Sequence, residues 1–334
     1  MKKDNKQKKR KFRPAVFFAG LFYIIVFLCI TTPLVLIYGP YENTKKTIVS
    51  TVLATRHAYL IKDFLSQSTI DSILGNTSEG TTSVTQDMSK VKIKFNTGNE
   101  INRININTDR FDGYLLEIKN PLKVKVSMTK YLGKMGQKTS EMASDHDAVA
   151  AINGGAFVDR SSDGTEYAGT GAVPGGLVIS NGQLIYPKTG LDENEVFNVA
   201  AFSKDGKLIV GDHSYADLKA LNVQEAMCFR KPNVIINGVR QIRNKMEEGL
   251  NPRTAIGQKE DGTVLFLVID GRKLTAPGAS LYDVQEILMS RGAVNAAALD
   301  GGYSSTMYYK GDVINSPNAW DGERSVATAF YVED

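Results

Sequence analysis

The stretch Ala296-Ala297-Ala298-Leu299-Asp300-Gly301 is an apolar run that ends in an aspartate and a glycine, and this unit recurs in the chain. The other three copies end at Asn153-Gly154, Asn237-Gly238 and Asp270-Gly271, after the runs 148–152, 234–236 and 264–269. A continuous apolar run predicts a strand buried on both faces, with the polar residue emerging where the sheet meets solvent. The glycine allows close approach of a substrate or another backbone. The four ends therefore predict either a shared polar pocket or four ordinary tight turns.

The surrounding sequence has the same strand-rich texture. Short apolar runs such as 115–118 and 124–128 are separated by turn residues. Three further pairs between amphipathic runs predict hairpin turns, namely Asn181-Gly182, Asp205-Gly206 and Asp261-Gly262. A helical pattern covers 281–289, with Ser280 as its N-cap and Gly292 beyond its end. The predicted fold class is α+β, a strand-dominated globular domain with a few helices.

The amino-terminal segment predicts a membrane anchor. No charged residue lies between Pro14 and Tyr41, and at about 1.5 Å per residue the helix 14–38 can cross a layer of roughly 30 Å. The rival interpretation is a cleaved signal peptide, but the run is longer than a typical signal core and offers no small-x-small cleavage site. Residues 1–13 hold eight Lys or Arg against one acid, which favours a cytoplasmic amino terminus. We expect a single-pass protein of the cell membrane with an extracytoplasmic carboxyl-terminal domain.

Charge and cysteine content narrow the class of the outer part. Without residues 1–13 the chain has 32 basic and 35 acidic side chains, a net charge of about −3, so the basic character belongs to the tail. A nucleic-acid-binding domain is therefore not expected. Cys228 is alone outside the anchor, since Cys29 lies within it, and no intrachain disulfide can stabilise the outer domain. This suits a bacterial surface that does not rely on disulfides.

The expected organisation has five parts. They are a cytoplasmic basic tail (1–13), a transmembrane helix (14–38), a helical juxtamembrane stalk (39–75), a linker (76–90) and a globular domain (91–334). The linker is rich in Ser, Thr and Gly, whereas the stalk has few helix breakers. Whether the stalk is free or packs on the domain is left open.

The residues near the apolar runs favour chemistry on phosphate. Asp270-Gly271-Arg272 and Glu323-Arg324 combine carboxylates with guanidinium groups, and Asp300 is followed by three hydroxyls. Arginine suits phosphate or carboxylate, hydroxyls hold anionic oxygens, and carboxylates perform acid–base work or bind a metal. The three histidines have no partner at zinc-site spacing, no Gly-x-Ser-x-Gly elbow occurs, and Cys228 carries no sign of activation.

Five motifs in order resemble the phosphodiester glycosidase domain family, to which N-acetylglucosamine-1-phosphodiester α-N-acetylglucosaminidase belongs. They are Ala151-Ile152-Asn153-Gly154-Gly155-Ala156-Phe157, Asn251-Pro252-Arg253-Thr254-Ala255-Ile256-Gly257, Val268-Ile269-Asp270-Gly271-Arg272, the stretch from Asn295 to Met307, and Glu323-Arg324-Ser325-Val326. The resemblance covers about 91–334. The anchor and stalk are also similar to those of membrane-bound Gram-positive members described as exopolysaccharide biosynthesis proteins.

The resemblance implies an extracytoplasmic hydrolase that releases a sugar from a sugar-1-phosphodiester in cell-envelope glycopolymer, exopolysaccharide or lipid-linked sugar phosphate. The implied catalytic residues are Asp300, Asp270, Arg253, Arg272 and Glu323. The implied substrate-binding residues are Asn153, Gly154, Thr254, Gly301, Gly302, Ser304, Ser305, Thr306 and Arg324. In the resulting hypothesis Arg253 and Arg272 bind phosphate oxygens, while Asp300 and Asp270 are the acid, base or nucleophile. Either aspartate could instead cap its turn or hold a divalent cation, and no other cofactor is expected.

Several alternatives stay open at this stage. The same residues are compatible with two other functions. The protein could bind anionic glycopolymer without cleaving it, or it could be a transferase that moves a glycosyl or phosphoglycosyl group between carriers. The sugar, the phosphate carrier, metal dependence and the oligomeric state are not specified. Tyr303 stands where many family members carry a small residue, which suggests that it narrows the sugar subsite or stacks in it.

Overall fold

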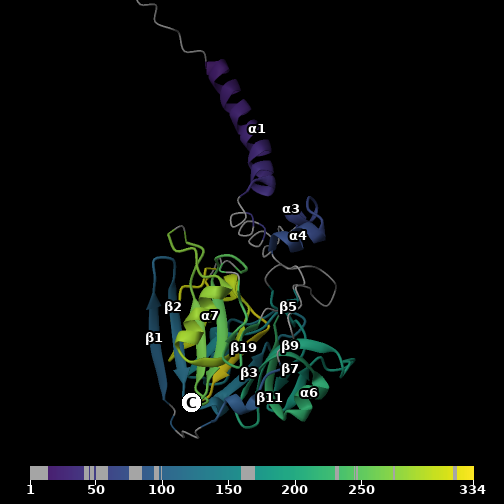
Figure 1. The fold of residues 1–334 in the computed structure, drawn as a ribbon, viewed down its shortest axis with the longest axis vertical. Helices are drawn as coiled ribbons and strands as arrows, with labels where there is room; N and C mark the ends of the chain where they lie inside the picture. Colours follow the sequence, from purple (N-terminus) through teal and green to yellow (C-terminus); the bar gives the residue numbers. More distant parts are fainter. Residues whose placement is uncertain are drawn as a thin grey trace, which may run out of the picture.

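The computed structural model describes residues 14–40, 45, 49, 59–74, 85–93, 98, 100–158, 170–229, 233–243, 245, 247–273, 275–318 and 322–334. Three sheets form a strand-rich body, and helix α1 (Pro14–Tyr38) extends away from it (Figure 1). The predicted class, α+β with strands dominant, is confirmed.

The largest sheet has seven strands, all paired antiparallel. In spatial order they are β1 (Ile101–Asn107), β2 (Asp112–Ile118), β15 (Val264–Ile269), β14 (Arg253–Lys259), β16 (Ala293–Ala298), β12 (Asn233–Ile236) and β13 (Val239–Arg240). Helix α7 (Leu281–Ser290) packs against one face of this sheet. Ser280 caps α7 by accepting a hydrogen bond from the Asp283 N–H, and Gly292 (φ 83°) follows its end, as the sequence predicted.

Two five-stranded sheets complete the body. One has the order β10 (Leu208–Ser214), β9 (Val196–Ser203), β11 (Val223–Cys228), β7 (Val178–Ser180) and β8 (Gln183–Tyr186). The other has the order β18 (Asp312–Val313), β17 (Met307–Tyr309), β4 (Ala150–Asn153), β19 (Thr328–Val332) and β3 (Val124–Met128). The smaller elements are β5 (Phe157–Val158) paired with β6 (Val173–Pro174), helices α5 (Thr139–Asp145) and α6 (Tyr215–Ala220), and short 3-10 turns at Met88–Lys90, Pro121–Lys123 and Gly302–Ser304.

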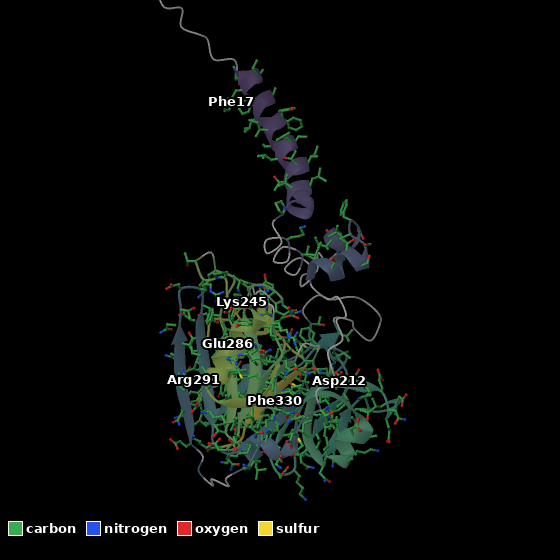
Figure 2. All side chains as sticks on the ribbon, viewed as in Figure 1. Phe17, Asp212, Lys245, Glu286, Arg291 and Phe330 are labelled. Atoms are coloured by element: carbon green, nitrogen blue, oxygen red, sulfur yellow. The ribbon has the colours of Figure 1, made fainter. Side chains whose placement is uncertain are left out.

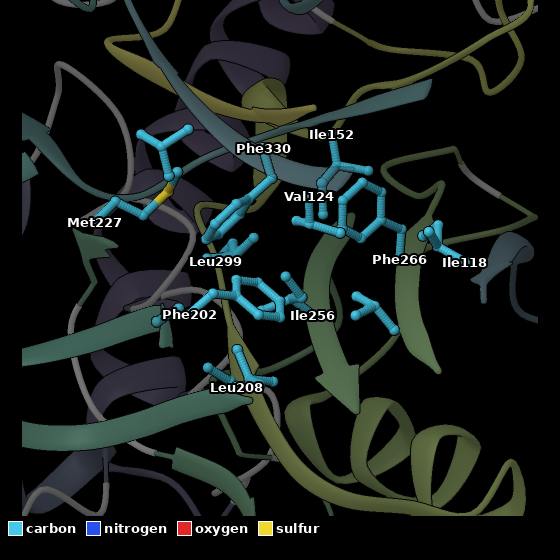
Figure 3. Packing of buried hydrophobic residues seen from close by; sticks show 14 of the residues in the cluster. Ile118, Val124, Ile152, Phe202, Leu208, Met227, Ile256, Phe266, Leu299 and Phe330 are labelled. Carbon is cyan, nitrogen blue, oxygen red and sulfur yellow. The ribbon is translucent and has the colours of Figure 1, made fainter. Parts of the chain in front are cut away.

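The main core lies where the three sheets meet (Figure 3). Phe266, Phe202 and Phe330 come one from each sheet, and the rings of Phe202 and Phe330 meet edge-on at 6.0 Å between centroids. Strand β15 is buried along its whole length, because Phe266 faces this core while Leu265 and Leu267 face α7. The predicted burial of this apolar run on both faces is therefore confirmed.

The three predicted hairpin turns are also present. Asn181-Gly182 joins β7 to β8, Asp205-Gly206 joins β9 to β10, and Asp261-Gly262 joins β14 to β15. At the first of these both residues have positive φ, 50° and 73°, which matches the twist of the flanking strands.

Helix α1 is long and apolar enough to cross a membrane over Pro14–Thr32, and a signal sequence meets the same test. Its side chains, Phe17 among them, project into open space in Figure 2. The expected stalk contains α3 (Tyr59–Lys62) and α4 (Gln67–Leu74), whose buried residues Ile61 and Ile70 cluster with Val49. His57 lies outside the described residues.

The chain joins the body before residue 91, where the sequence placed the domain boundary. The side chain of Gln86 donates to the Leu208 carbonyl (2.7 Å) and accepts from the Val210 N–H (2.8 Å). The amide of Asp87 donates to Asn237 Oδ1 at 2.7 Å. Residues 85–93 are thus attached to the body although part of them was expected to be linker.

Candidate active site

Strand direction brings two of the predicted polar ends to one edge of the large sheet. Strands β15 and β16 both run antiparallel to β14, so Asp270 and Asp300, which follow them, flank the start of β14 at Arg253. Strand β12 is antiparallel to β16, and its polar end at Asn237 therefore lies at the opposite edge. Asn237 belongs to the attachment of residues 85–93 and not to this site.

Asn153, at the end of β4, joins a second sheet to this edge. Its amide nitrogen donates to the Asp300 carbonyl at 2.6 Å, and its Oδ1 accepts from Thr254 Oγ1 (2.7 Å) and from the Thr306 N–H (3.1 Å). The Asn153 side chain is fully buried. This geometry favours a supporting role for Asn153 and Thr254 in place of the predicted substrate contact.

Glycines permit the close packing around Asp300. The Gly154 carbonyl accepts from the Asp300 N–H at 3.0 Å, and the Gly302 N–H donates to the Pro252 carbonyl at 2.9 Å. A Cβ at Gly301 would lie 2.8 Å from that same carbonyl oxygen. Gly302 has φ of 62°, and a Cβ there would lie 2.9 Å from a terminal nitrogen of Arg272. The doubled glycine thus leaves room for the Arg272 guanidinium across the turn.

Three hydroxyls follow this turn. Ser304, Ser305 and Thr306 are buried, with exposed fractions of 0%, 2% and 0%. Their hydroxyl oxygens have no hydrogen-bond partner in the part of the chain that the structure describes. Buried polar atoms are normally hydrogen-bonded, so three adjacent exceptions indicate a place where a polar ligand can supply the missing bonds.

Arg272, which follows Asp270-Gly271, has a strained backbone conformation, with φ of 58°. Its guanidinium carbon is 4.2 Å from the ring centroid of Tyr303, and one nitrogen contacts Asn251 Oδ1 at 3.4 Å. Nε and the other terminal nitrogen are buried without a hydrogen-bond partner among the described residues. Burial lowers the pKa of Arg272, nearby Arg324 acts in the same direction, and Tyr303 and Asp300 oppose them. A desolvated cation with unused donors suits an anionic ligand.

Arg253 has a different environment. Its Nε donates to the Ala279 carbonyl at 2.9 Å, and its terminal nitrogens donate to the Glu248 carboxylate (2.9 Å) and to the carbonyls of Glu248 (2.9 Å) and Gly249 (2.8 Å). These bonds tie the segment before β14 to the start of α7. The geometry favours a structural role for Arg253 over the predicted phosphate contact.

Asp270 is also held by protein groups. Its carboxylate accepts from Asn315 Nδ2 at 2.9 Å and from the Ser316 N–H at 3.0 and 3.1 Å. The same Asn315 nitrogen donates to the Ser305 carbonyl (3.0 Å), while Asn315 Oδ1 accepts from the Met307 N–H (2.8 Å). Asp270 therefore braces the backbone that carries the hydroxyls, a contact that favours a positioning role over direct acid–base chemistry.

The neighbouring residues Glu323 and Arg324 have different contacts and therefore different roles. Glu323 accepts from the N–H (3.1 Å) and the hydroxyl of Ser140, in the first turn of α5, so its carboxylate is bound to that helix. The guanidinium carbon of Arg324 lies 4.7 Å from the ring centroid of Phe157, and its charge acts on Arg272. Arg324 stays a candidate ligand, whereas Glu323 is favoured as a support.

Asn315, Ser316 and Asn251 were missed from the sequence. The stretch Asn315-Ser316-Pro317 has the composition of a turn, which is the signal that could have marked it. Nothing local indicates that the turn reaches Asp270, 45 residues earlier. As to a metal, no group of three or more His, Cys, Asp or Glu side chains suitable for an ion occurs among the described residues.

Comparison with known proteins gives a consistent result. A family model described as phosphodiester glycosidase matches residues 146–333. N-acetylglucosamine-1-phosphodiester alpha-N-acetylglucosaminidase of Mus musculus is 28% identical over 250 residues, which cover 66% of this chain and 46% of that protein. The SPbeta prophage-derived protein YomE of Bacillus subtilis is 43% identical over 88 residues, 25% of this chain and 13% of that one. The chain thus spans less than half the length of these relatives.

A solved structure shares the fold. The catalytic domain of the zebrafish N-acetylglucosamine-1-phosphodiester alpha-N-acetylglucosaminidase, auto-inhibited by its pro-peptide, matches with a TM-score of 0.57 at 21% identity. The match covers 73% of this chain and 86% of the zebrafish chain. The family resemblance inferred from the five motifs is confirmed by the family model.

Proposed function

The chain belongs to the phosphodiester glycosidase family, and on that premise we propose that it hydrolyses a sugar-1-phosphodiester, releasing the sugar and leaving the phosphate on its carrier. The observation that carries the proposal is the environment of Arg272. Two of its buried nitrogens have no hydrogen-bond partner among the described residues, and three buried hydroxyls in the same condition follow its neighbour Tyr303. A phosphodiester offers one negative charge and several acceptor oxygens, which match this set of donors.

The leaving group explains why one carboxylate suffices. Breaking the bond between the anomeric carbon and the phosphate oxygen releases a phosphate monoester, whose second pKa is about 6. Such a group departs at neutral pH without a proton from the enzyme, provided that its growing charge is stabilised. Arg272 and the hydroxyls of residues 304–306 supply that stabilisation. The firm binding of Asp270 and Glu323 by other protein groups is compatible with this scheme.

Asp300 performs the remaining step in the proposal. It precedes the Gly301-Gly302 turn, and Gly302 packs against the Arg272 guanidinium, so Asp300 lies beside the proposed phosphate position. As a general base it takes a proton from water, the water oxygen bonds to the anomeric carbon, and the electron pair of the broken bond goes to the phosphate. As a nucleophile its oxygen bonds to that carbon while the bond to the phosphate breaks, and water then cleaves the aspartyl–sugar bond, which frees the sugar and restores the carboxylate. The anomer of the product distinguishes the two routes.

The location of the reaction is part of the proposal. Eight basic residues precede α1, which supports a cytoplasmic amino terminus, a single membrane crossing and an outer catalytic domain. Substrates in reach are cell-envelope glycopolymers and lipid-linked sugar phosphates. The name of the mouse relative suggests N-acetylglucosamine as the first sugar to test.

Product analysis tests this function. Full-length protein in detergent is incubated with sugar-1-phosphodiesters of N-acetylglucosamine, glucose and galactose, and products are identified by mass spectrometry. We expect free sugar and a phosphate monoester in equal amounts, and no change in products when a sugar acceptor is added. Transfer to the acceptor would indicate a transferase, and binding without cleavage would contradict the proposal.

A further inference from the structure

A hollow beside α5 lies outside the site described so far. It has a volume of about 420 Å³ and is called here the α5 hollow. Its lining comes from the segment between β3 and α5 and from α5 itself, namely Lys130, Tyr131, Met135, Gln137, Ser140, Glu141, Ser144 and Asp145. None of these residues is implied by the family motifs.

The wall of the α5 hollow combines exposed apolar and fixed polar groups. Tyr131 and Met135 are 42% and 50% exposed, so the α5 hollow presents an aromatic ring and a thioether side by side in its lining. Asp145 is held in place, since it accepts from Lys130 Nζ at 2.8 Å and from Gln137 Nε2 at 2.8 Å. The same ammonium group lies 5.5 Å from the Tyr131 ring centroid. An aromatic surface thus adjoins acceptors in fixed positions.

This combination matches a neutral sugar. A pyranose presents C–H groups on its faces, which pack on aromatic rings and on soft side chains such as methionine, and hydroxyls around its edge, which donate to carboxylates. The lining carries two carboxylates, Glu141 and Asp145, against one ammonium group, Lys130. An excess of negative charge disfavours phosphate in the α5 hollow.

The α5 hollow is linked to the candidate active site by one side chain. Ser140 lines it, and the N–H and hydroxyl of Ser140 both donate to Glu323. The next residue is Arg324, whose charge acts on Arg272. A single peptide unit therefore connects the wall of the α5 hollow to the guanidinium groups beside the phosphate position.

We propose that the α5 hollow binds a neutral saccharide unit of the substrate, at a distance from the scissile phosphodiester. The inference rests on the proposed function and extends it, because it names a glycan, and not a single sugar phosphate, as the substrate. Glu323 then has a clear purpose, since it fixes the first turn of α5 relative to Arg324.

Binding and turnover are measured separately in the test. Calorimetry on full-length protein uses a panel of neutral tetrasaccharides built on glucose, galactose, mannose and N-acetylglucosamine. At least one should bind, and Tyr131→Ala should weaken that binding about tenfold or more. Tyr215→Ala is the matched control, because Tyr215 on α6 also has a lysine near its ring, Lys219 at 5.0 Å. Thermal unfolding checks that both variants are folded.

The kinetic arm compares two substrates that share one sugar-1-phosphodiester, one small and one extended by the tetrasaccharide that binds. Tyr131→Ala should raise KM about tenfold for the extended substrate and change kcat/KM less than twofold for the small one. If neither substrate is hydrolysed, the proposed function fails, while the calorimetry still decides whether the hollow binds saccharide. Absence of binding by every tetrasaccharide, or equal binding by wild type and Tyr131→Ala, overturns the inference.

Discussion

The guanidinium carbon of Arg272 lies 4.2 Å from the centre of the Tyr303 ring, and Tyr303 is 40% exposed. The ring thus covers one side of a cation whose Nε and one terminal nitrogen are buried without a hydrogen-bond partner among the described residues. Contact with the aromatic ring stabilises the positive charge. Burial lowers the pKa of Arg272 and Tyr303 opposes that effect, while two buried nitrogens remain available to an anion.

Replacing Arg272 tests this arrangement. Arg272→Ala should lower kcat/KM for a sugar-1-phosphodiester by about 10²–10³-fold, because a pre-positioned donor to the developing charge is lost. Inorganic phosphate should raise the melting temperature of the wild type but not that of the variant, since a ligand stabilises only the state that binds it. Arg103→Ala is the matched control, because Arg103 also lies over a tyrosine ring, that of Tyr114 at 5.7 Å. Equal loss in both variants would refute the assignment.

Asn315 offers a test of positioning. It bonds to Asp270, to the Ser305 carbonyl and to the Met307 N–H, so Asn315→Ala should lower the free energy of unfolding by about 2–3 kcal/mol. The rate should fall as well, mainly in kcat, because the hydroxyls lose their support. Asn318→Ala, which removes one 3.0 Å bond to the Gly271 carbonyl, should cost about 1 kcal/mol. Chemical denaturation measures both, and a smaller effect at Asn315 than at Asn318 would contradict this role.

Cys228 should be chemically inert. Burial raises the pKa of its thiol to about 12, and its sulfur contacts the Leu177 N–H at 3.2 Å. A raised thiol pKa means that the protonated form persists below about pH 12, so only roughly one molecule in 10⁴ is a thiolate at pH 8. In a Cys29→Ser background, a disulfide reagent should leave native protein unlabelled from pH 7 to 9 and label it after denaturation. Rapid labelling of folded protein at pH 8 is the opposite outcome.

The apolar runs predicted much of the fold because burial depends on local pattern. A run such as 264–269 can be stable only with both faces covered, and Asx-Gly pairs favour a tight turn wherever they occur. The convergence of Asp270 and Asp300 was not derivable from the pattern, since it depends on β14 lying between β15 and β16. For the same reason the pattern did not show that Asn237 lies apart from the other polar ends. Its strand, β12, runs antiparallel to β16.

The sequence predicted which types of residue lie at the site better than it predicted the role of each residue. Arg253 and Arg272 both follow the composition of a phosphate site, yet only the folded structure shows that Arg253 is engaged by the Ala279 carbonyl, 26 residues away. Asn153 likewise has the polarity of a substrate ligand. Its side chain instead forms three hydrogen bonds within the protein, to Asp300, Thr254 and Thr306. Such partners lie far apart in the chain, where no local pattern connects them.

Asp300 has the central role in the proposed mechanism, because it precedes the Gly301-Gly302 turn that packs against Arg272. The decisive measurement is release of free sugar from a sugar-1-phosphodiester by wild type, Asp300→Asn and the control Asp312→Asn, which alters an exposed aspartate. With all three proteins equally folded by circular dichroism, Asp300→Asn should lose at least about 10³-fold in kcat, while Asp312→Asn, at an exposed position of strand β18, stays within twofold of wild type. Turnover by Asp300→Asn at the wild-type rate would contradict the account.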